Sequence, residues 1–524
     1  MKKTLKIETF DQAGLLASVV PFFGSTTPLE NILLGLSQPP YGCKTVVKEL
    51  EYVDKDYQDE YAAYYCKAFK SYGARCDRWH FFSCDIPPAT TTDFAQYEPH
   101  YLGYMVIRPT DLQRVGRTVL RPALTDHNRQ FFHCTAACHT NILGQEFKVT
   151  GMPFIQQDTQ VGACAQASIW MLARYMSRKF GYREYLPSEI NSYAKANIAL
   201  GRPLPAENGL TSFQILDALK GIGIPALIYS RDNLGNCSRH IEKAFPVIKK
   251  TPRDENDEKA QHYVQNTVKL ADIAYRYIES GLPVIIGTDN HALVGIGHTY
   301  DPTKAATVAI ERIPAFFVNN DNTGPYREMP IFTTSATDYS FNQARCVIPV
   351  LPHEVTLRGE DAELMARECV DELLEAVVIP GPPPVKYRDQ ISIINPALAG
   401  ALNGLEYRTF LQASVAFQKS LREDMNADRL DKQVGQELLL LDYPKYVWVT
   451  EVSSTKLLNH PDRKDRKCVG RIICDSTAPA KTRGVIAMHV ADLLQLVGRN
   501  GGTKPIATPH PGSTPFGHKV LAQA

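Results

Sequence analysis

Residues 150–332 constrain the fold most, because helix-like patterns give way there to strand-like ones. Apolar residues recur on one face of a first helix that begins near Gly162, and these are Ile169, Leu172, Ala173, Met176 and Phe180. Two further helices are predicted over 209–224 and 268–281. Three apolar strands follow, at 284–286, 291–301 and 314–326. Helices followed by strands in this way predict an α+β fold.

The whole chain has 524 residues, and at roughly 150 residues per domain this length predicts about three domains. The region 1–149 is predicted to be mixed α/β and includes a buried strand at 101–109. The central domain, 150–332, is followed by an α+β region over 333–498. The composition of 499–524 predicts a flexible tail.

The region 333–498 carries its own secondary-structure signals. Helices are predicted over 361–377 and 408–421. A hairpin is predicted from the strands 446–452 and 470–476, which a charged tip joins.

Charge and hydropathy exclude several classes of partner. The net charge of +1 gives no overall attraction to nucleic acid or to an anionic membrane. No stretch approaches the roughly 18 consecutive apolar residues that a membrane-spanning helix needs. The N-terminus starts like a signal peptide, but Glu8 and Asp11 interrupt the part that should be apolar. We therefore expect a cytoplasmic protein that binds neither nucleic acid nor membrane.

The cysteines favour a reducing compartment. Twelve cysteines are too sparse for a disulfide scaffold in a chain of this length, and no C-x-x-C pair occurs. The nearest approach to a metal motif is "HCTAACH", residues 133–139. It forms a single cluster, whereas a structural zinc usually needs two separated ligand pairs. We therefore predict no metal and no cofactor.

Cys164 opens the first central helix, in "QQDTQVGACAQASIWML". A free cysteine is often a small core residue, and this is the simplest reading. A thiol at a helix N-terminus is also where the helix dipole favours the thiolate. Its small neighbours, Ala163 and Ala165, leave room for a substrate. Cys164 is therefore a candidate nucleophile.

A base and an orienting group would complete such a site. Among the 14 histidines, His291 is the best placed, because it lies at the start of an apolar strand. Asp321 ends the next strand, with Asn320 beside it, where an orienting residue is expected. An imidazolium at His291 would be expected to lower the pKa of the thiol further. His298 lies seven residues downstream, so it should face the other side of the strand and be packed or hydrogen-bonded.

An oxyanion donor is expected just upstream of the nucleophile. A glutamine side chain there can donate its amide N–H to a developing oxyanion, together with the N–H of Cys164. Gln157 is the leading candidate, and Gln156 and Gln160 are alternatives. Asn320 likewise remains an alternative to Asp321 as the orienting residue.

Taken together, these segments resemble the papain-like cysteine peptidases. The resemblance is greatest to the bacterial family related to the bacteriocin leader-processing peptidases. "PFIQQ" and "CAQASIWML" are similar to its glutamine strand end and cysteine-initiated helix, and "SGLPVII" and "HALVGIGHTYD" to its histidine strand. "FFVNNDNTGPY" is similar to its closing strand. The resemblance covers residues 150–332 and implies a papain-like core, with a nucleophile-helix half and an antiparallel-sheet half.

Carried over by position, the resemblance implies four roles. Cys164 corresponds to the nucleophile, His291 to the base and acid, Asp321 or Asn320 to the orienting residue and Gln157 to the oxyanion donor. It implies a cysteine peptidase that acts on a protein or peptide.

Two other hypotheses stay open. One is a papain-fold acyltransferase, peptidyltransferase or deamidase, because a fold does not fix a reaction. The other is a catalytically inert binding module. In each case the flanking regions are expected to contact a substrate or a partner protein.

Overall fold

The protein has an α+β fold with two compact units. The computed structural model describes residues 5–19, 27–88, 93–110, 115–157, 164–194, 209–235, 237–244, 255–304, 306, 308–332, 339–378, 405–427, 429–479, 484–490, 493–498, 503–507 and 514–515. The first unit comprises Met1–Ser230, Pro283–Gly297 and Phe316–Val350. The second comprises Arg231–Leu282, His298–Ala315 and Leu351–Ala524. The segment 150–332, predicted as one contiguous domain, thus contributes to both units.

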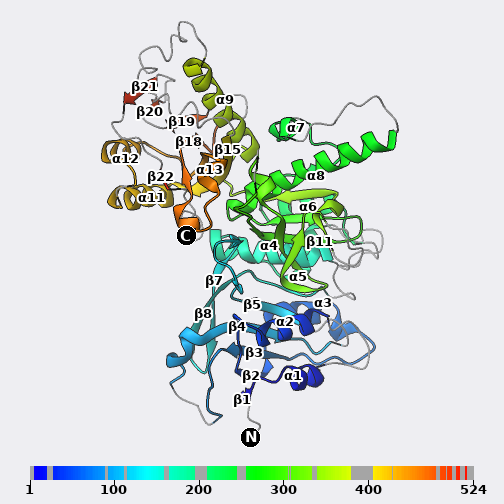
Figure 1. Cartoon of the computed structure of the whole chain (residues 1–524). Helices are drawn as coiled ribbons and strands as arrows, with labels where there is room; N and C mark the ends of the chain where they lie inside the picture. The colour runs from blue at the N-terminus through cyan, green and yellow to red at the C-terminus, as the bar shows by residue number, and fades with distance from the viewer. Residues whose placement is uncertain are drawn as a thin grey trace. The chain divides into compact units, whose positions relative to one another are not determined.

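The first unit begins with a five-stranded antiparallel sheet in the order β1-β2-β3-β4-β5 (Figure 1). Its strands are β1 (Leu5–Thr9), β2 (Thr45–Tyr52), β3 (Cys76–Phe82), β4 (Tyr101–Ile107) and β5 (Val115–Leu120). Every residue of β4 is buried, as expected for the strand predicted at 101–109. The helices of this part are α1 (Gln12–Val19), α2 (Thr27–Ser37) and α3 (Lys55–Ala63), and a hairpin of β7 (Ala136–Ile142) and β8 (Gln145–Gly151) follows the sheet.

A second sheet carries the segments that the sequence singled out. Its order is β13-β12-β11-β10-β14-β9, with β6 paired to β11. The strands are β6 (Gln130–Phe132), β9 (Tyr229–Ser230), β10 (Val284–Gly287), β11 (Ala292–Thr299), β12 (Ala315–Asn320), β13 (Gly324–Pro330) and β14 (Cys346–Pro349). Strand β10 runs antiparallel to both β11 and β14. The strands predicted at 284–286 and 291–301 are confirmed as β10 and β11, whereas the strand predicted over 314–326 is β12, a turn and the start of β13.

Helix α4 (Cys164–Phe180) packs against this second sheet. Its apolar side chains share one core with those of the sheet strands, as Ile169 and Leu172 do with Ile285, Val294 and Ile348. Two shorter helices, α5 (Pro187–Tyr193) and α6 (Ser212–Gly221), follow α4. The helices predicted from near Gly162 and over 209–224 are confirmed as α4 and α6.

The core of the first unit is continuous from the N-terminal sheet to α4. Leu33 of α2, Trp79 of β3 and Leu102 of β4 belong to the same cluster of buried apolar residues as Ile169 and Val294. Each of these five side chains is at most 2 % exposed. The N-terminal 150 residues are therefore part of the body that carries Cys164, because the two share one core.

The second unit is built on a six-stranded sheet in the order β15-β16-β18-β19-β20-β21. Its strands are β15 (Leu405–Ala413), β16 (Tyr446–Ser454), β18 (Gly470–Asp475), β19 (Val485–Val490), β20 (Leu493–Val497) and β21 (Thr503–Ala507), and the short β17 (Lys467–Cys468) pairs with β22 (Thr514–Pro515). Its helices are α7 (His240–Ala244), α8 (Glu255–Glu279), α9 (Gly359–Val378), α11 (Ser414–Asn426), α12 (Lys432–Leu439) and α13 (Thr455–Leu458). Helices α11 and α12 bury Phe417 and Val434 against Val449 and Ile473 of the sheet.

Two predictions for the C-terminal region meet a different structure. The helix predicted over 408–421 begins only at Ser414, because the preceding residues form β15 and pair with β16 along nine residues. A short buried apolar run has the same appearance in a helix and in a strand, so periodicity could not separate them. In the predicted tail 499–524, the described segments β21 and β22 are paired strands. The hairpin is confirmed, with Val449 opposite Ile473.

Two further expectations concern membranes and cysteines. Within the segments that the structure describes, no helix combines the length and the apolar character needed to cross a bilayer. All twelve cysteines lie in described segments, and no two of them are joined by a disulfide.

Candidate functional site

Cys164 is the first residue of α4 and is half-buried. Backbone N–H groups of Cys164, Ala165 and Ala292 approach its thiol and lower its pKa. One turn further along α4, the hydroxyl of Ser168 donates to the carbonyl of Ala292 at 3.1 Å. Because Ala292 directly follows His291, these contacts bring the start of α4 to the start of the histidine strand.

The charge state of the Cys164 thiol differs from the sequence-based expectation. A helix N-terminus and a nearby imidazolium were expected to lower the pKa of the thiol. Burial instead raises the pKa of Cys164 to about 11, and the nearby Asp321 carboxyl also raises it. The three amide N–H groups offset only part of this effect, because a thiolate removed from water loses more solvation than they restore.

His291 is held in one orientation by the turn before it and by the end of β12. Its backbone N–H donates to the hydroxyl of Thr288 at 3.1 Å, and its carbonyl accepts from the N–H of Thr288 at 2.8 Å. Its ring Nε2 lies 2.9 Å from Oδ1 of Asn320. The ring of Tyr339 packs over the imidazole, with 5.0 Å between centroids.

The contacts of Asn320 fix the tautomer of His291. The backbone N–H of Asn322 donates to the same Oδ1 of Asn320 at 2.9 Å, so this atom is the amide oxygen. An oxygen can only accept, so Nε2 of His291 carries the proton. The other ring nitrogen, Nδ1, is then unprotonated and can accept a proton. Burial lowers the pKa of His291, which keeps the imidazole neutral.

Asp321 lies on the same side of His291 as Asn320. Its Oδ1 is 3.3 Å from Nε2 of His291, but neither carboxylate oxygen has a hydrogen-bond partner among the described residues. The side chain is fully buried, and burial raises the pKa of Asp321 to about 8. The structure therefore gives Asn320 the hydrogen bond to the resting imidazole and places Asp321 within ion-pair distance of it.

The upstream glutamines separate into different environments. The side-chain amide of Gln157 donates to Oδ1 of Asn322 at 2.9 Å, so Gln157 lies beside the Asn320–Asn322 turn. Gln156 is buried, and its side-chain oxygen accepts from the N–H of Val115 at 3.1 Å. Gln160, the third candidate, lies outside the described residues.

Two other predicted features lie elsewhere. Nε2 of His298 is 2.7 Å from the carboxylate of Glu279, as expected for a hydrogen-bonded histidine. In "HCTAACH", Cys138 is buried on β7, whereas His139 is exposed and contacts Glu146. Of this motif, His133 alone belongs to a group of described side chains close enough together to hold a metal ion.

Sequence reasoning missed Asn322 and Tyr339. Asn322 was given no role, although a polar side chain directly after an orienting pair is a signal that could have been used. Tyr339 contacts His291 from 48 residues downstream, with β11, β12 and β13 between them in the chain, so no local pattern indicates it.

Comparisons of the chain with protein-family models, with curated proteins and with solved structures found no match.

Proposed function

We propose that the chain is a cysteine peptidase that hydrolyses a peptide or isopeptide bond through a thioester acyl-enzyme, on a papain-like core. The observation that carries the proposal is the hydrogen bond from Nε2 of His291 to Asn320, because it leaves Nδ1 unprotonated. An imidazole in this state can act as a general base for a neighbouring thiol. The contacts of Cys164 and Ser168 with Ala292 support Cys164 as that thiol.

In the proposed reaction, the sulfur of Cys164 attacks the substrate carbonyl as its proton passes to Nδ1 of His291. The carbonyl oxygen becomes an oxyanion, which the side-chain amide of Gln157 and the N–H of Cys164 stabilise. The C–N bond then breaks, His291 returns the proton to the leaving amine, and a thioester remains. Water attacks the thioester with His291 again as the base, which releases the carboxylic acid and restores the thiol.

Burial favours the neutral forms of Cys164, His291 and Asp321, and this determines where charge develops during the proposed reaction. Burial disfavours the thiolate, the imidazolium and the ionised Asp321 alike. A proton moved to His291 creates a cation 3.3 Å from Asp321, and that cation favours ionisation of the carboxyl. Asn320 is thus proposed to orient the resting imidazole, and Asp321 to stabilise the imidazolium.

Labelling with a biotinylated, thiol-reactive peptidyl epoxide tests the proposal. The wild-type chain is expected to label at Cys164, and Cys164→Ala and His291→Ala are expected not to label while keeping their melting temperatures within a few degrees. Cys346→Ala removes a half-buried thiol on β14, in the sheet against which α4 packs; it is the matched control and should label normally. Labelling that survives His291→Ala would contradict the proposal and favour an inert binding module.

Product analysis with a competing amine separates hydrolysis from transfer. The proposed peptidase releases mainly the free acid from a labelled peptide library even when glycinamide is present. A product that is mainly the amide would assign the chain to the acyltransferases instead.

A further inference from the structure

Helix α3 lies in the N-terminal region, outside the predicted catalytic segment. It is linked both to α4, which Cys164 begins, and to the residues around Gln157 upstream of Cys164. Asp56 and Glu60 are four residues apart on α3, so their carboxylates lie on one face of the helix, and both are buried. A buried carboxylate is stable only with cationic or hydrogen-bonding partners. The partners of these two residues lie on different parts of the proposed site.

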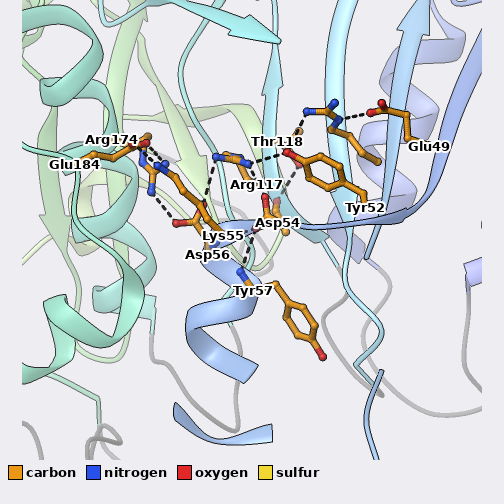
Figure 2. Close-up of polar contacts among 12 residues, drawn as sticks. Glu49, Tyr52, Asp54, Lys55, Asp56, Tyr57, Arg117, Thr118, Arg174 and Glu184 are labelled. Atoms are coloured by element: carbon orange, nitrogen blue, oxygen red, sulfur yellow. Dashed lines mark hydrogen bonds and ion pairs between the residues drawn. The ribbon is translucent and has the colours of Figure 1, made fainter. Parts of the chain in front are cut away.

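Asp56 contacts α4, the helix that Cys164 begins. Its Oδ1 accepts from Arg174 at 2.7 Å and from the indole N–H of Trp170 at 3.2 Å (Figure 2 shows the contact with Arg174). Arg174 also pairs with Glu184, which follows α4. This branch fixes α4 relative to α3.

Glu60 is linked through Arg108 to Gln156, the residue before Gln157. One terminal nitrogen of Arg108 donates to Glu60 at 3.1 Å, and the other donates to the backbone carbonyl of Gln156, also at 3.1 Å. Arg108 is 1 % exposed. The guanidinium fork therefore joins α3 to the residue immediately before Gln157.

Strand β5 also holds the same segment. The backbone N–H of Gln156 donates to the carbonyl of Val115, and the N–H of Val115 donates to the Gln156 side chain, each at 3.1 Å. Two residues earlier, Phe154 and Thr118 exchange backbone hydrogen bonds at 2.8 Å. With Gln156 held at its backbone N–H, its carbonyl and its side chain, little freedom is left to the position of Gln157.

We infer that Arg108, held by Glu60, is a positioning residue for the oxyanion-binding Gln157. This inference rests on the proposed function. A misplacement of about 1 Å in a catalytic group can cost roughly 100-fold in rate, so loss of the Arg108 contact should reduce acylation. It should not reduce alkylation by iodoacetamide, because displacement of iodide generates no oxyanion.

The network supplies a matched control. Arg117 is another arginine of the first unit, with a side chain that is 12 % exposed, and it donates to the carboxylate of Asp54 at 2.6 Å and to the hydroxyl of Tyr52 at 3.4 Å (Figure 2). Asp54 caps α3 by accepting from the N–H groups of Asp56 and Tyr57. Loss of Arg117 therefore disturbs α3 and the folding stability without removing a contact to Gln156.

The experiment measures two rates at Cys164 in the full chain: alkylation by iodoacetamide and release of 4-nitrophenolate from 4-nitrophenyl acetate. Arg108→Lys keeps the positive charge beside Glu60, but a single ammonium lacks the fork that reaches both partners. We expect Arg108→Lys and Arg108→Met to lower acylation by roughly tenfold or more, with alkylation within about twofold of wild type. Arg117→Met should change both rates by less than about twofold. If Arg108→Met does not fold, Arg108→Lys carries the test.

Combination with Gln157→Ala distinguishes positioning from general destabilisation. If Arg108 acts through Gln157, Arg108→Lys should cause no further loss of acylation in a Gln157→Ala background, because coupled residues are not additive. Additive losses, or equal losses in the Arg108 and Arg117 variants, would overturn the inference. If Gln157→Ala acylates normally while Cys164 still labels with the epoxide, the inference fails and the peptidase proposal stands. A wild-type chain whose Cys164 neither acylates nor labels overturns both.

Discussion

The carboxyl of Asp321 is the residue whose burial has the clearest consequence for stability. Its pKa of about 8 in the folded protein lies far above the roughly 3.9 of an exposed aspartate. Between these two values the folded state binds more protons than the unfolded state, so the free energy of unfolding falls as pH rises. Above about pH 8 the loss is complete, and below about pH 4 it is absent.

Asp321→Asn should therefore stabilise the protein by an amount that grows with pH. We expect a difference in melting temperature close to zero at pH 4.5, and a gain by pH 8.5 that corresponds to a few kcal/mol, on the order expected for a buried carboxylate. Asp85→Asn, which removes an exposed carboxylate beside Lys44, is the control and should show no such trend. A difference that is independent of pH would mean that Asp321 is already ionised in the folded protein.

The Cys164 thiol gives a second prediction at this scale. With its pKa raised to about 11, the rate of alkylation by iodoacetamide should keep increasing from pH 7 to pH 10. His298→Ala should show the same profile, because His298 is bound to Glu279. A rate that is already at its plateau near pH 6 would show that a thiolate–imidazolium pair exists before substrate binds.

At the scale of the elements, β11 directly follows His291, and in its interior the backbone of β6 approaches it closely. A Cβ at Gly297 would lie 2.2 Å from the carbonyl oxygen of Phe131 on β6. The pairing of β6 with β11 therefore depends on a glycine at this position, and a side chain would push the two strands apart.

Gly297→Ala should lower the free energy of unfolding by about 1–3 kcal/mol, as overpacking of a buried site does. Gly35→Ala is the matched substitution, because nothing lies within 4 Å of a Cβ at that position of α2. It should raise stability by up to about 1 kcal/mol, through the higher helix propensity of alanine. Urea unfolding measures both changes, and an unchanged midpoint for Gly297→Ala would show that β6 can move away at no cost.

Sequence reasoning succeeded for elements whose signal is local. The face of α4 and the apolar runs of β10, β11 and β12 are visible within windows of 4 to 17 residues, and they led to Cys164 and His291. It failed at β15, where a buried strand and a buried helix look the same. It could not find the link from Glu60 through Arg108 to Gln156, because its members are 48 residues apart at each step and only the folded chain brings them together.

For the whole molecule, the shared core of the first unit predicts that the N-terminal region cannot be removed. A chain that begins at Gly151 would lose Leu33, Trp79 and Leu102 and expose the faces of Ile169 and Val294 that they help to cover. We expect this fragment to be insoluble or unfolded and not to label with the epoxide. Co-expression of residues 1–150 should restore soluble, labelled protein. A fragment that folds and labels alone would show that the N-terminal region is dispensable.

The discontinuity of the two units has a consequence for synthesis. Domains fold as units while the chain leaves the ribosome, N-terminal parts first. The first unit includes Phe316–Val350, so it is complete only after the second unit has contributed two segments to the growing chain. Cys164 is therefore translated long before Asn320 and β14. Until these are made, α4 belongs to a nascent chain in which the sheet it packs against is incomplete. The order of translation by itself delays the assembly of the proposed site, in which Cys164 meets His291 and Asn320, until most of the polypeptide has been made.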